Sequence, residues 1–167
     1  AVAPWNKGKA TVLATTNRLA SPWAALVNGT AAHALDYDDV LEPAAAHVSA
    51  VLVPALLALG EERSASGAAI IDAYLVGFEI MARLAESLNM AHYNRGWHTT
   101  LTLGAPAVAA ACARLLRLDE SSTQAALSLS TSMAGGFKRQ FGTMTKPLHA
   151  GLAAKNGLLA AKLAAAG

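Results

Sequence analysis

Four of the five histidines in this chain fall in or beside segments that the sequence marks as irregular, namely His47, His92, His98 and His149. Lys146 stands in one of the same segments. Histidine changes its charge near neutral pH and can therefore give or take a proton in a reaction. Catalytic groups concentrate in loops that a rigid scaffold carries. The placement indicates acid/base chemistry, with a lysine to hold negative charge.

A cluster of carboxylates precedes these histidines. Asp36, Asp38 and Asp39 stand within four positions at the end of a predicted helix. Carboxylates this close repel one another, so we expect at least one to have a shifted pKa or to bind a cation. They also oppose the helix dipole, which requires a compensating contact. A solvated helix end is the alternative interpretation.

The neighbours of His98 favour a site for an anion. Gly96 allows a tight turn, and Trp97 can form the wall of a pocket. Thr99 and Thr100 open a predicted helix, where hydroxyls and backbone N–H groups can hold a carboxylate. A purely structural histidine is the alternative.

Lys146 is followed by Pro147. Proline disfavours helical backbone at the residue before it, so the sequence predicts an extended Lys146 whose side chain points into a pocket. There the lysine would neutralise a carboxylate of a substrate or act as an acid. The alternative is a surface lysine that precedes a helix.

Charge is unevenly distributed along the chain. Residues 121–167 contain five basic residues and no acid, whereas the carboxylate cluster lies near the other end. A folded chain can set these two regions against each other, which suits a small anionic substrate that exchanges protons. Solvated surface charge is the alternative.

The elements that must position these groups are predicted to be helices. Apolar spacing and cap residues predict helices over residues 22–35, 48–62, 68–88, 101–116, 120–134 and 148–165. Irregular segments are expected over residues 36–47, 89–98 and 137–147. Because the chain shows no alternating strand pattern, we predict an all-α fold, a bundle of about six helices.

Particular residues support these boundaries. Ser21 before Pro22 is expected to cap the first helix, Thr99 or Thr100 the fourth, and Asp119 the fifth. In the third helix, helical spacing predicts one buried face, formed by Ile71, Leu75, Phe78, Met81 and Ala85.

Composition excludes several classes of protein. The 167 residues suit one domain, and a hydrophobic share of 54% against 14% charged residues argues against disorder. A net charge of +2 gives no basis for a nucleic-acid partner. The apolar run over residues 48–60 is shorter than the roughly 20 residues of a membrane span. The single cysteine, Cys112, excludes an internal disulfide, fits a cytoplasmic protein and is expected in the core.

Five separated stretches, in the same order and with similar spacing, resemble the MmgE/PrpD family. They are Asn28-Gly29-Thr30-Ala31-Ala32-His33-Ala34-Leu35-Asp36-Tyr37-Asp38-Asp39, His47 with Val51-Leu52-Val53-Pro54-Ala55-Leu56, Gly77-Phe78-Glu79, Arg95-Gly96-Trp97-His98-Thr99-Thr100, and Lys146-Pro147-Leu148-His149-Ala150-Gly151. The family includes 2-methylcitrate dehydratases, cis-aconitate decarboxylases and iminodisuccinate epimerases. The resemblance covers nearly the whole chain from about residue 8.

The resemblance implies an all-helical domain beside a smaller α/β lid domain, in a homodimer, with no metal and no organic cofactor. It implies that His47 and His98 form an acid/base pair, that Lys146 anchors a carboxylate, and that Asp36 orients a histidine or a substrate hydroxyl. We add candidate substrate-binding residues, which are Arg139, Thr99, Thr100 and His149.

Three features depart from the family pattern. The decarboxylase members have a threonine directly after the acidic cluster, where this chain has Val40, and one extra residue precedes His47. The chain lacks a starting methionine and ends at Gly167, before any lid. We therefore expect residues 1–167 to be a single helical domain and a fragment of a larger two-domain enzyme.

The predicted function is a cofactor-independent lyase that dehydrates a small di- or tricarboxylate such as 2-methylcitrate. An epimerase or a decarboxylase acting on a related polycarboxylate is the first alternative, because one acid/base constellation supports all three reactions. A metal-dependent hydrolase is the second, with the ligands His33, Asp36, Asp38 and His47. A non-catalytic helical interaction module is the third.

Overall fold

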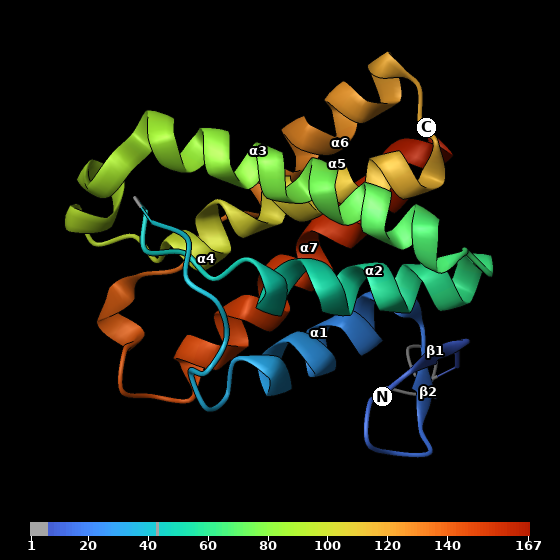
Figure 1. The fold of residues 1–167 in the computed structure, drawn as a ribbon, viewed down its shortest axis with the longest axis horizontal. Coiled ribbons are helices and arrows are strands. Elements are labelled where there is room, and N and C mark those ends of the chain that lie inside the picture. The colour runs from blue at the N-terminus through green and yellow to red at the C-terminus, as the bar shows by residue number, and fades with distance from the viewer. Residues whose placement is uncertain (1–6, 43) are drawn as a thin grey trace.

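Helix α7 (Thr145–Ala166) runs through the middle of the molecule, and α1, α2, α5 and α6 pack around it (Figure 1). The computed structural model describes residues 7–42 and 44–167, and only the backbone of Asn89. The other elements in this part of the chain are β1 (Ala10–Thr11), β2 (Arg18–Leu19), α1 (Ser21–Ala32), α2 (Ser49–Arg63), α3 (Gly67–Asn94), α4 (Thr99–Thr102), α5 (Gly104–Leu116), α6 (Glu120–Ser132) and the 3-10 turn η2 (Lys138–Gln140). The all-α prediction is confirmed.

Helices α1 and α7 cross closely because glycine faces glycine at their contact. A Cβ atom added to Gly29 would lie 3.0 Å from the Cα of Gly151, and one added to Gly151 would lie 2.2 Å from the carbonyl oxygen of Leu26. Side chains larger than hydrogen would force the helices apart. The close crossing brings the segment that follows α1 next to the first turn of α7.

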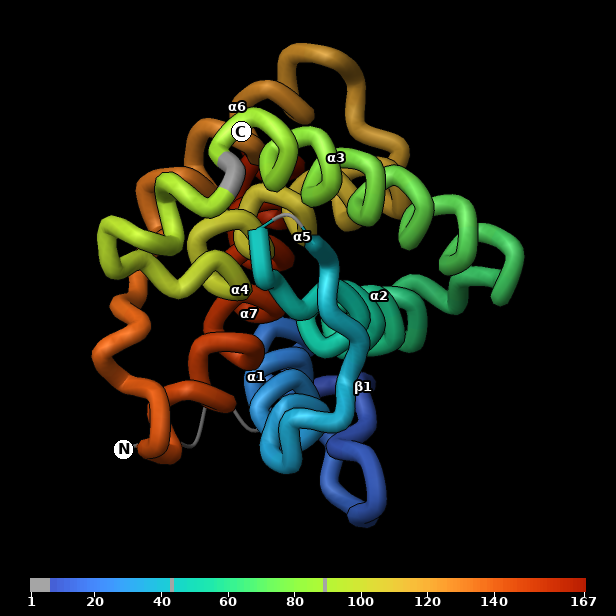
Figure 2. The backbone as a smooth tube through the Cα atoms, turned by 60° about the vertical axis from the view of Figure 1, so that its left-hand side comes forward, coloured from blue at the N-terminus to red at the C-terminus, as the bar shows by residue number. Residues whose placement is uncertain are grey.

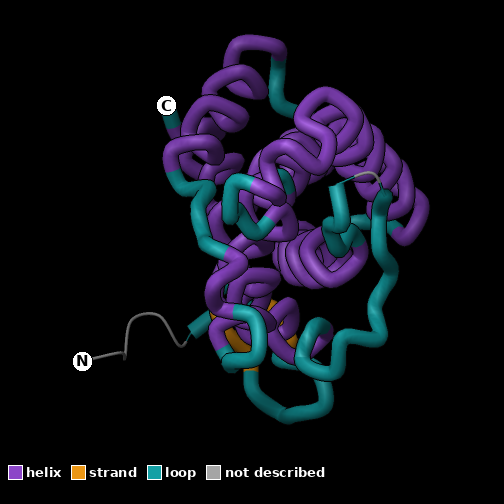
Figure 3. The backbone as a smooth tube through the Cα atoms, turned by 90° about the vertical axis from the view of Figure 1, so that its left-hand side faces the viewer, coloured by secondary structure: helices purple, strands orange, loops and turns teal. Residues whose placement is uncertain are grey.

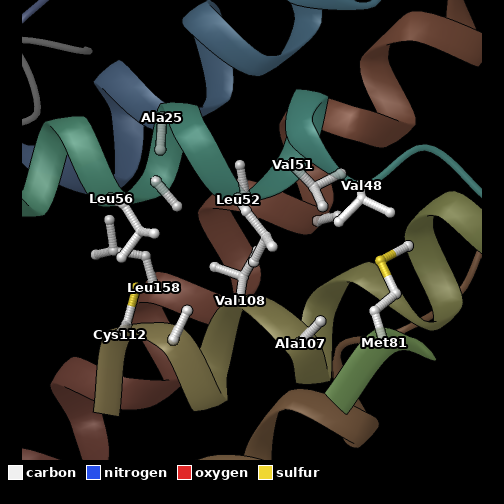
Figure 4. Packing of buried hydrophobic residues seen from close by; sticks show 14 of the residues in the cluster. Ala25, Val48, Val51, Leu52, Leu56, Met81, Ala107, Val108, Cys112 and Leu158 are labelled. Carbon is white, nitrogen blue, oxygen red and sulfur yellow. The ribbon is translucent and has the colours of Figure 1, made fainter. Parts of the chain in front are cut away.

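The core lies between α2, α5 and α7. Leu52 and Leu56 of α2, Val108 of α5 and Leu158 of α7 are fully buried and point toward one another (Figure 4). Burial of an aliphatic side chain of this size stabilises a fold by about 1.5–3 kcal/mol. Cys112 also lies in this cluster, and burial raises the pKa of its thiol. The predicted core position of this cysteine is confirmed.

Residues 99–116, which include α4 and α5, are long and apolar enough by composition to cross a membrane. Burial accounts for this character, because 78% of the stretch is enclosed by the rest of the bundle. The sequence predicted one helix here, from residue 101. The structure has two, because the helix breaks at Leu103, and this break raises the number of α-helices in the described residues from six to seven.

Helix α3 differs from its prediction in length and in its buried face. It continues to Asn94, so His92 lies on a helix and not in the predicted loop, and the turn at Gly96, with φ +99°, follows its end. The buried face is formed by residues four positions apart, namely Ala73, Gly77, Met81 and Ala85. The prediction was wrong for Ile71 and Leu75, which are 63% and 60% exposed, because small residues allow α3 to pack closely on α2 and α5.

The start of α7 also differs from the prediction. Lys146 lies in the first turn of the helix and has helical backbone, so the prediction of an extended Lys146 was wrong. Proline is tolerated in a first turn because the N–H that it lacks has no partner there. The lysine side chain still reaches a pocket, as described below.

Two of the three predicted caps are wrong. Ser21 is the first residue of α1, and its hydroxyl donates to Glu62 of α2, which also binds Lys162 at 2.7 Å. The hydroxyls of the threonines at the start of α4 contact the segment before α2 and do not cap their helix. Asp119 does cap α6, since its carboxylate accepts a 2.8 Å hydrogen bond from the backbone N–H of Ser122. At Ser21 and at the two threonines, hydrogen bonds to distant parts of the chain replace the local cap.

The small sheet was not predicted, because strands of two residues are too short to show alternation. Strands β1 and β2 form an antiparallel pair beside α1. Asn28 of α1 ties the hairpin down, donating to the carbonyl of Thr11 at 2.9 Å and accepting from the N–H of Leu13 at 3.0 Å.

The segments over residues 36–42, 44–47 and 137–144 lie at the same end of the bundle, at the left of Figure 1, together with α4 and the first turn of α7. Figures 2 and 3 turn this end toward the viewer. The backbone N–H of His98 donates to the carbonyl of Gly136 at 3.0 Å, and Trp97 pairs with Phe137 in a β-bridge. These bonds attach the second segment to the residues that precede α4.

Candidate active site

Asp36 and Lys146 meet between the end of α1 and the start of α7. Asp36 adopts a left-handed backbone with φ +58°, a conformation that aspartate tolerates better than most residues and that recurs at functional sites. The Nζ atom of Lys146 donates a 2.5 Å hydrogen bond to its carboxylate. This hydrogen bond lowers the pKa of Asp36 from its ordinary value, so the group is ionised at neutral pH. The compensating contact expected for the acidic cluster is therefore a lysine.

Asp38 contacts two histidines. Both of its carboxylate oxygens lie 2.9 Å from Nδ1 of His33, and Oδ2 lies 3.0 Å from Nδ1 of His47. The centroids of the two imidazole rings are 4.2 Å apart. His33 is fully buried, so one carboxylate serves two rings in a region from which water is largely excluded.

His47 lies between Asp38 and Asp36. Its Nε2 atom is 3.6 Å from Oδ1 of Asp36, on the side of the ring that faces the pocket described below. Burial lowers the pKa of His47, and the charge of His33 lowers it further, whereas the two carboxylates oppose that shift. The ring is therefore neutral in the free protein and surrounded by the negative charge that would stabilise its protonated form.

Thr99 and Thr100 hold the segment that carries His47. The hydroxyl of Thr100 accepts a 3.2 Å hydrogen bond from the backbone N–H of His47, and the hydroxyl of Thr99 donates to the carbonyl of Ala45 at 3.0 Å. Both threonines are completely buried and are not among the residues that line the pocket. Their predicted role in substrate binding stays a prediction. In the structure, their hydroxyls bind the backbone of the segment that carries His47.

His98 precedes α4 and is 1% exposed. Its Nδ1 atom lies 2.8 Å from Nδ1 of His149, in the first two turns of α7, and its ring meets that of Phe141 edge to face at 4.9 Å. Burial lowers the pKa of His98 to about 3, and the neighbouring His149 contributes in the same direction. His98 is thus neutral and, unlike His47, has no carboxylate against its ring among the described residues.

These groups share one pocket with a volume of about 300 Å3. It is lined by Asp36, Val40, Ala45, His47, Tyr93, His98, Phe141 and Lys146. All four residues predicted to be catalytic therefore face the same space. Two neutral histidines, an ionised carboxylate and a lysine around a pocket of this size can bind a small anion and move protons on it.

A second pocket, of about 620 Å3, adjoins the first and shares Tyr93 and Phe141 with it. Arg139 and Lys138 line this neighbouring space, and Lys138 stacks over the Tyr93 ring at 4.2 Å. Arg139, predicted to bind substrate, is thus beside the histidine pocket and not within it. Its role stays a prediction.

Four residues could also hold a metal ion. His33, Asp36, Asp38 and His47 offer nitrogen and oxygen atoms within 4.8 Å of one another, a donor set that suits several divalent metals. However, the Lys146 ammonium already pairs with Asp36, and Asp38 already contacts both rings. The cluster thus has an internal counter-charge that a bound cation would have to displace.

Sequence reasoning missed several residues of the site. Asp38 was considered only as a member of the carboxylate cluster and as a metal ligand, and His33 only as a metal ligand, although both lie against His47. Tyr93 and Phe141 also line the pocket, although they stand 48 positions apart in the sequence. They were not singled out, because nothing in an isolated aromatic residue indicates that it lines a pocket. The spacing of Asp38 two residues after Asp36 was the one available signal.

Comparison with known proteins shows the family of this chain. The family description "MmgE/PrpD N-terminal domain" matches residues 3–167. The chain is 39% identical to the cis-aconitate decarboxylase of Homo sapiens over 90% of its length, and 34% identical to that of Aspergillus terreus over 96%. A cis-aconitate decarboxylase-like protein of Aspergillus oryzae is 35% identical over 95% of the chain. The chain spans about a third of the length of these relatives, namely 32%, 34% and 35%. Since the family description matches almost every residue, this protein belongs to the MmgE/PrpD family.

Proposed function

We propose that this chain carries the acid/base site of a cofactor-independent lyase that acts on a small di- or tricarboxylate. The observation that carries the proposal is the contrast between two histidines that face one pocket. His47 has two carboxylates against its ring, whereas His98 has a second histidine and a nearby lysine. Environments that separate two titratable groups in this way assign one as acid and the other as base.

His47 is the acid in this proposal. A substrate with several carboxylates adds negative charge to a pocket that already contains Asp36, and Asp38 lies 3.0 Å behind the ring. Nearby anions stabilise an imidazolium. Substrate binding therefore raises the pKa of His47 and favours its protonated form. The hydrogen bond from its backbone to Thr100 keeps the ring in place.

Lys146 is the anchor for a substrate carboxylate. Its side chain is 17% exposed and its ammonium lies 2.5 Å from Asp36. A partly buried cation also stabilises the charge that develops on a carboxylate when an adjacent C–H or C–C bond breaks. Asp36 holds the lysine in position and keeps its charge balanced before the substrate arrives.

Decarboxylation of cis-aconitate is the first candidate reaction, because two relatives of this chain are named cis-aconitate decarboxylases and a third is named a cis-aconitate decarboxylase-like protein. The C–C bond to one carboxylate breaks and releases carbon dioxide. Its electron pair forms a new C=C bond, and the former π pair takes a proton from His47. The net change is loss of carbon dioxide and gain of one proton, with Lys146 beside the remaining carboxylates.

Dehydration of a 2-methylcitrate-like hydroxy acid is the second candidate, and the observation that favours it is Val40. This apolar side chain lines the pocket at the position where the resemblance to the decarboxylases implies a threonine. In this reaction His98 takes a proton from carbon, and His47 protonates the hydroxyl that leaves as water. Return of the proton to the opposite face would instead give an epimerase.

The lid domain and the homodimer that the resemblance implies belong to the same proposal, as does the cytoplasmic location that the single cysteine favours. The intact protein is therefore the right material for the test. It is incubated with cis-aconitate, citrate, 2-methylcitrate and iminodisuccinate, and products are identified by NMR. Release of carbon dioxide identifies the first candidate and loss of water the second. A folded, dimeric protein that converts none of the four would contradict the proposal and favour a non-catalytic module.

A further inference from the structure

The contact between His98 and His149 constrains where protons can be. The two Nδ1 atoms are 2.8 Å apart, and both rings are buried, with exposures of 1% and 4%. A hydrogen bond needs one donor and one acceptor, and a neutral imidazole carries a proton on only one nitrogen. One Nδ1 must therefore be protonated and the other must not.

Two arrangements satisfy this condition. If His98 donates, its Nε2 presents a lone pair and can accept a proton. If His149 donates, Nε2 of His98 carries a proton and cannot act as a base. Burial lowers the pKa of both rings, so each is neutral near pH 7 and the choice is between two tautomers.

The positive charge of Lys146 favours one of these two tautomer arrangements. Lys146 lines the same pocket as His98, whereas His149 does not line that pocket. A cation on the pocket side favours the negative end of the imidazole dipole, which is the unprotonated nitrogen, on that side. His98 then carries its proton on Nδ1, which points at His149.

We propose that His149 is a positioning residue, which accepts a hydrogen bond from Nδ1–H of His98 and so holds the pocket-facing Nε2 of His98 as a base. Packing supports this assignment. Gly136 lies against the far edge of the His149 ring, where an added Cβ would be 3.1 Å from Cε1 and 3.2 Å from Nε2. The ring is therefore enclosed between Gly136 and His98, so it supports the site without touching substrate. This replaces the predicted substrate-binding role of His149.

The inference rests on the proposed function only for its effect on catalysis. Its structural part is tested first, without substrate, by long-range 1H–15N spectra of the intact protein labelled with 15N-histidine. We expect the proton of His98 on Nδ1 and that of His149 on Nε2. The opposite pair of tautomers would overturn the proposal, whatever the substrate proves to be.

Two variants test the functional part. In His149→Asn the amide oxygen can replace Nδ1 as the acceptor, so we expect the His98 tautomer and most of kcat to remain. In His149→Leu the acceptor is lost, and we expect a mixed His98 tautomer and a fall in kcat on the order of tenfold to a hundredfold, the range for hydrogen-bond partners that orient metal-bound histidines, with KM unchanged.

His92→Leu is the control, because His92 is a half-buried histidine near α4 that bonds to Thr102 at 2.8 Å and not to His98. We expect it to leave the His98 tautomer unchanged. Equal losses of kcat in His149→Asn and His149→Leu, with the wild-type tautomer kept in both, would show a merely structural role and overturn the proposal. A wild-type protein with the expected tautomers but no turnover would leave this inference standing and defeat only the proposed function.

Discussion

Lys146 and Asp36 stand 110 positions apart in the chain, and their side chains form a salt bridge of 2.5 Å at the mouth of the histidine pocket. The contact exists because α1 and α7 cross where Gly29 faces Gly151. The salt bridge therefore links the packing of the bundle to the charge of the site. It also places a cation where a substrate carboxylate would arrive, with its counter-ion already present.

Replacing Lys146 tests the anchor. Lys146→Met removes the cation and leaves Asp36 unpaired in a pocket that must accept an anion. We expect kcat/KM to fall by about a hundredfold to a thousandfold, the range for loss of one charge-stabilising donor. Lys155→Met is the control, since Lys155 is on the same helix but stacks on Trp23 at 4.8 Å. Equal activity in the two variants, measured by steady-state kinetics, would contradict the anchor role.

Asp38 is predicted to matter more than its neighbour. Asp38→Asn removes the negative charge that faces His33 and His47. The protonated form of His47 is then less stable. We expect kcat to fall by about tenfold to a hundredfold, the range for hydrogen-bond partners that orient metal-bound histidines. Asp39→Asn makes the same change one residue later, where the carboxylate binds Ser49 at the surface. A smaller loss of kcat in Asp38→Asn than in Asp39→Asn would refute this role.

Stability should fall in mild acid. His98 has a pKa of about 3 in the folded protein against an ordinary 6.5, so its neutral form is favoured by folding. That contribution is present in full above pH 6.5 and is lost as the pH falls toward 3. Between pH 7 and pH 5 we expect the free energy of unfolding in urea to drop by about 2 kcal/mol from His98 alone.

The comparison for this pH effect is His98→Asn, which has no titrating ring at that position. Its unfolding free energy should lose about 2 kcal/mol less over the same range than that of the wild type. His47 and His92 also have lowered pKa values and remain in both proteins, so their contribution cancels. An equal pH dependence in the two proteins would mean that His98 is not buried as described.

The glycine contact between α1 and α7 predicts a packing defect that reaches the site. In Gly151→Ala the new methyl group would meet the carbonyl of Leu26 and the hydroxyl of Thr30, both at 2.2 Å. We expect a loss of unfolding free energy of about 3 kcal/mol, at the upper end for overpacking, together with reduced activity. Gly135→Ala is the control, because nothing lies within 4 Å of its added Cβ. Thermal melting that ranks the two variants in the opposite order would contradict the crossing.

Much of the fold followed from local pattern, and the failures have identifiable causes. Asp119 caps α6 as predicted, because an aspartate cap needs only the backbone N–H of a residue three positions further along the chain. Ser21 does not cap α1, since Glu62 of another helix takes its hydroxyl. Ile71 and Leu75 are exposed because the packing face of α3 consists of Met81 and three small residues, Ala73, Gly77 and Ala85, a preference that hydrophobicity alone does not reveal.

In the candidate site, too, some features could be predicted from the sequence and others could not. His47, His98, Asp36 and Lys146 could be named from motifs, because each stands in a short stretch with distinctive neighbours. Their supporting contacts could not, since Asp38 facing two rings and His149 behind His98 depend on how distant segments meet. The helical backbone of Lys146 was mispredicted because the rule for residues before proline is weaker than the tolerance of proline in a first helical turn.

The most direct test of the central claim is 1H NMR of the intact protein with the polycarboxylate panel in deuterated buffer, compared with His47→Gln and His98→Asn. For decarboxylation the proposal predicts a product with deuterium at a single carbon, and His47→Gln slows this deuteration. For dehydration it predicts conversion with loss of a proton from carbon, which His98→Asn stops and His47→Gln slows. Undiminished conversion in both variants would contradict the assignment of acid/base chemistry to this pocket.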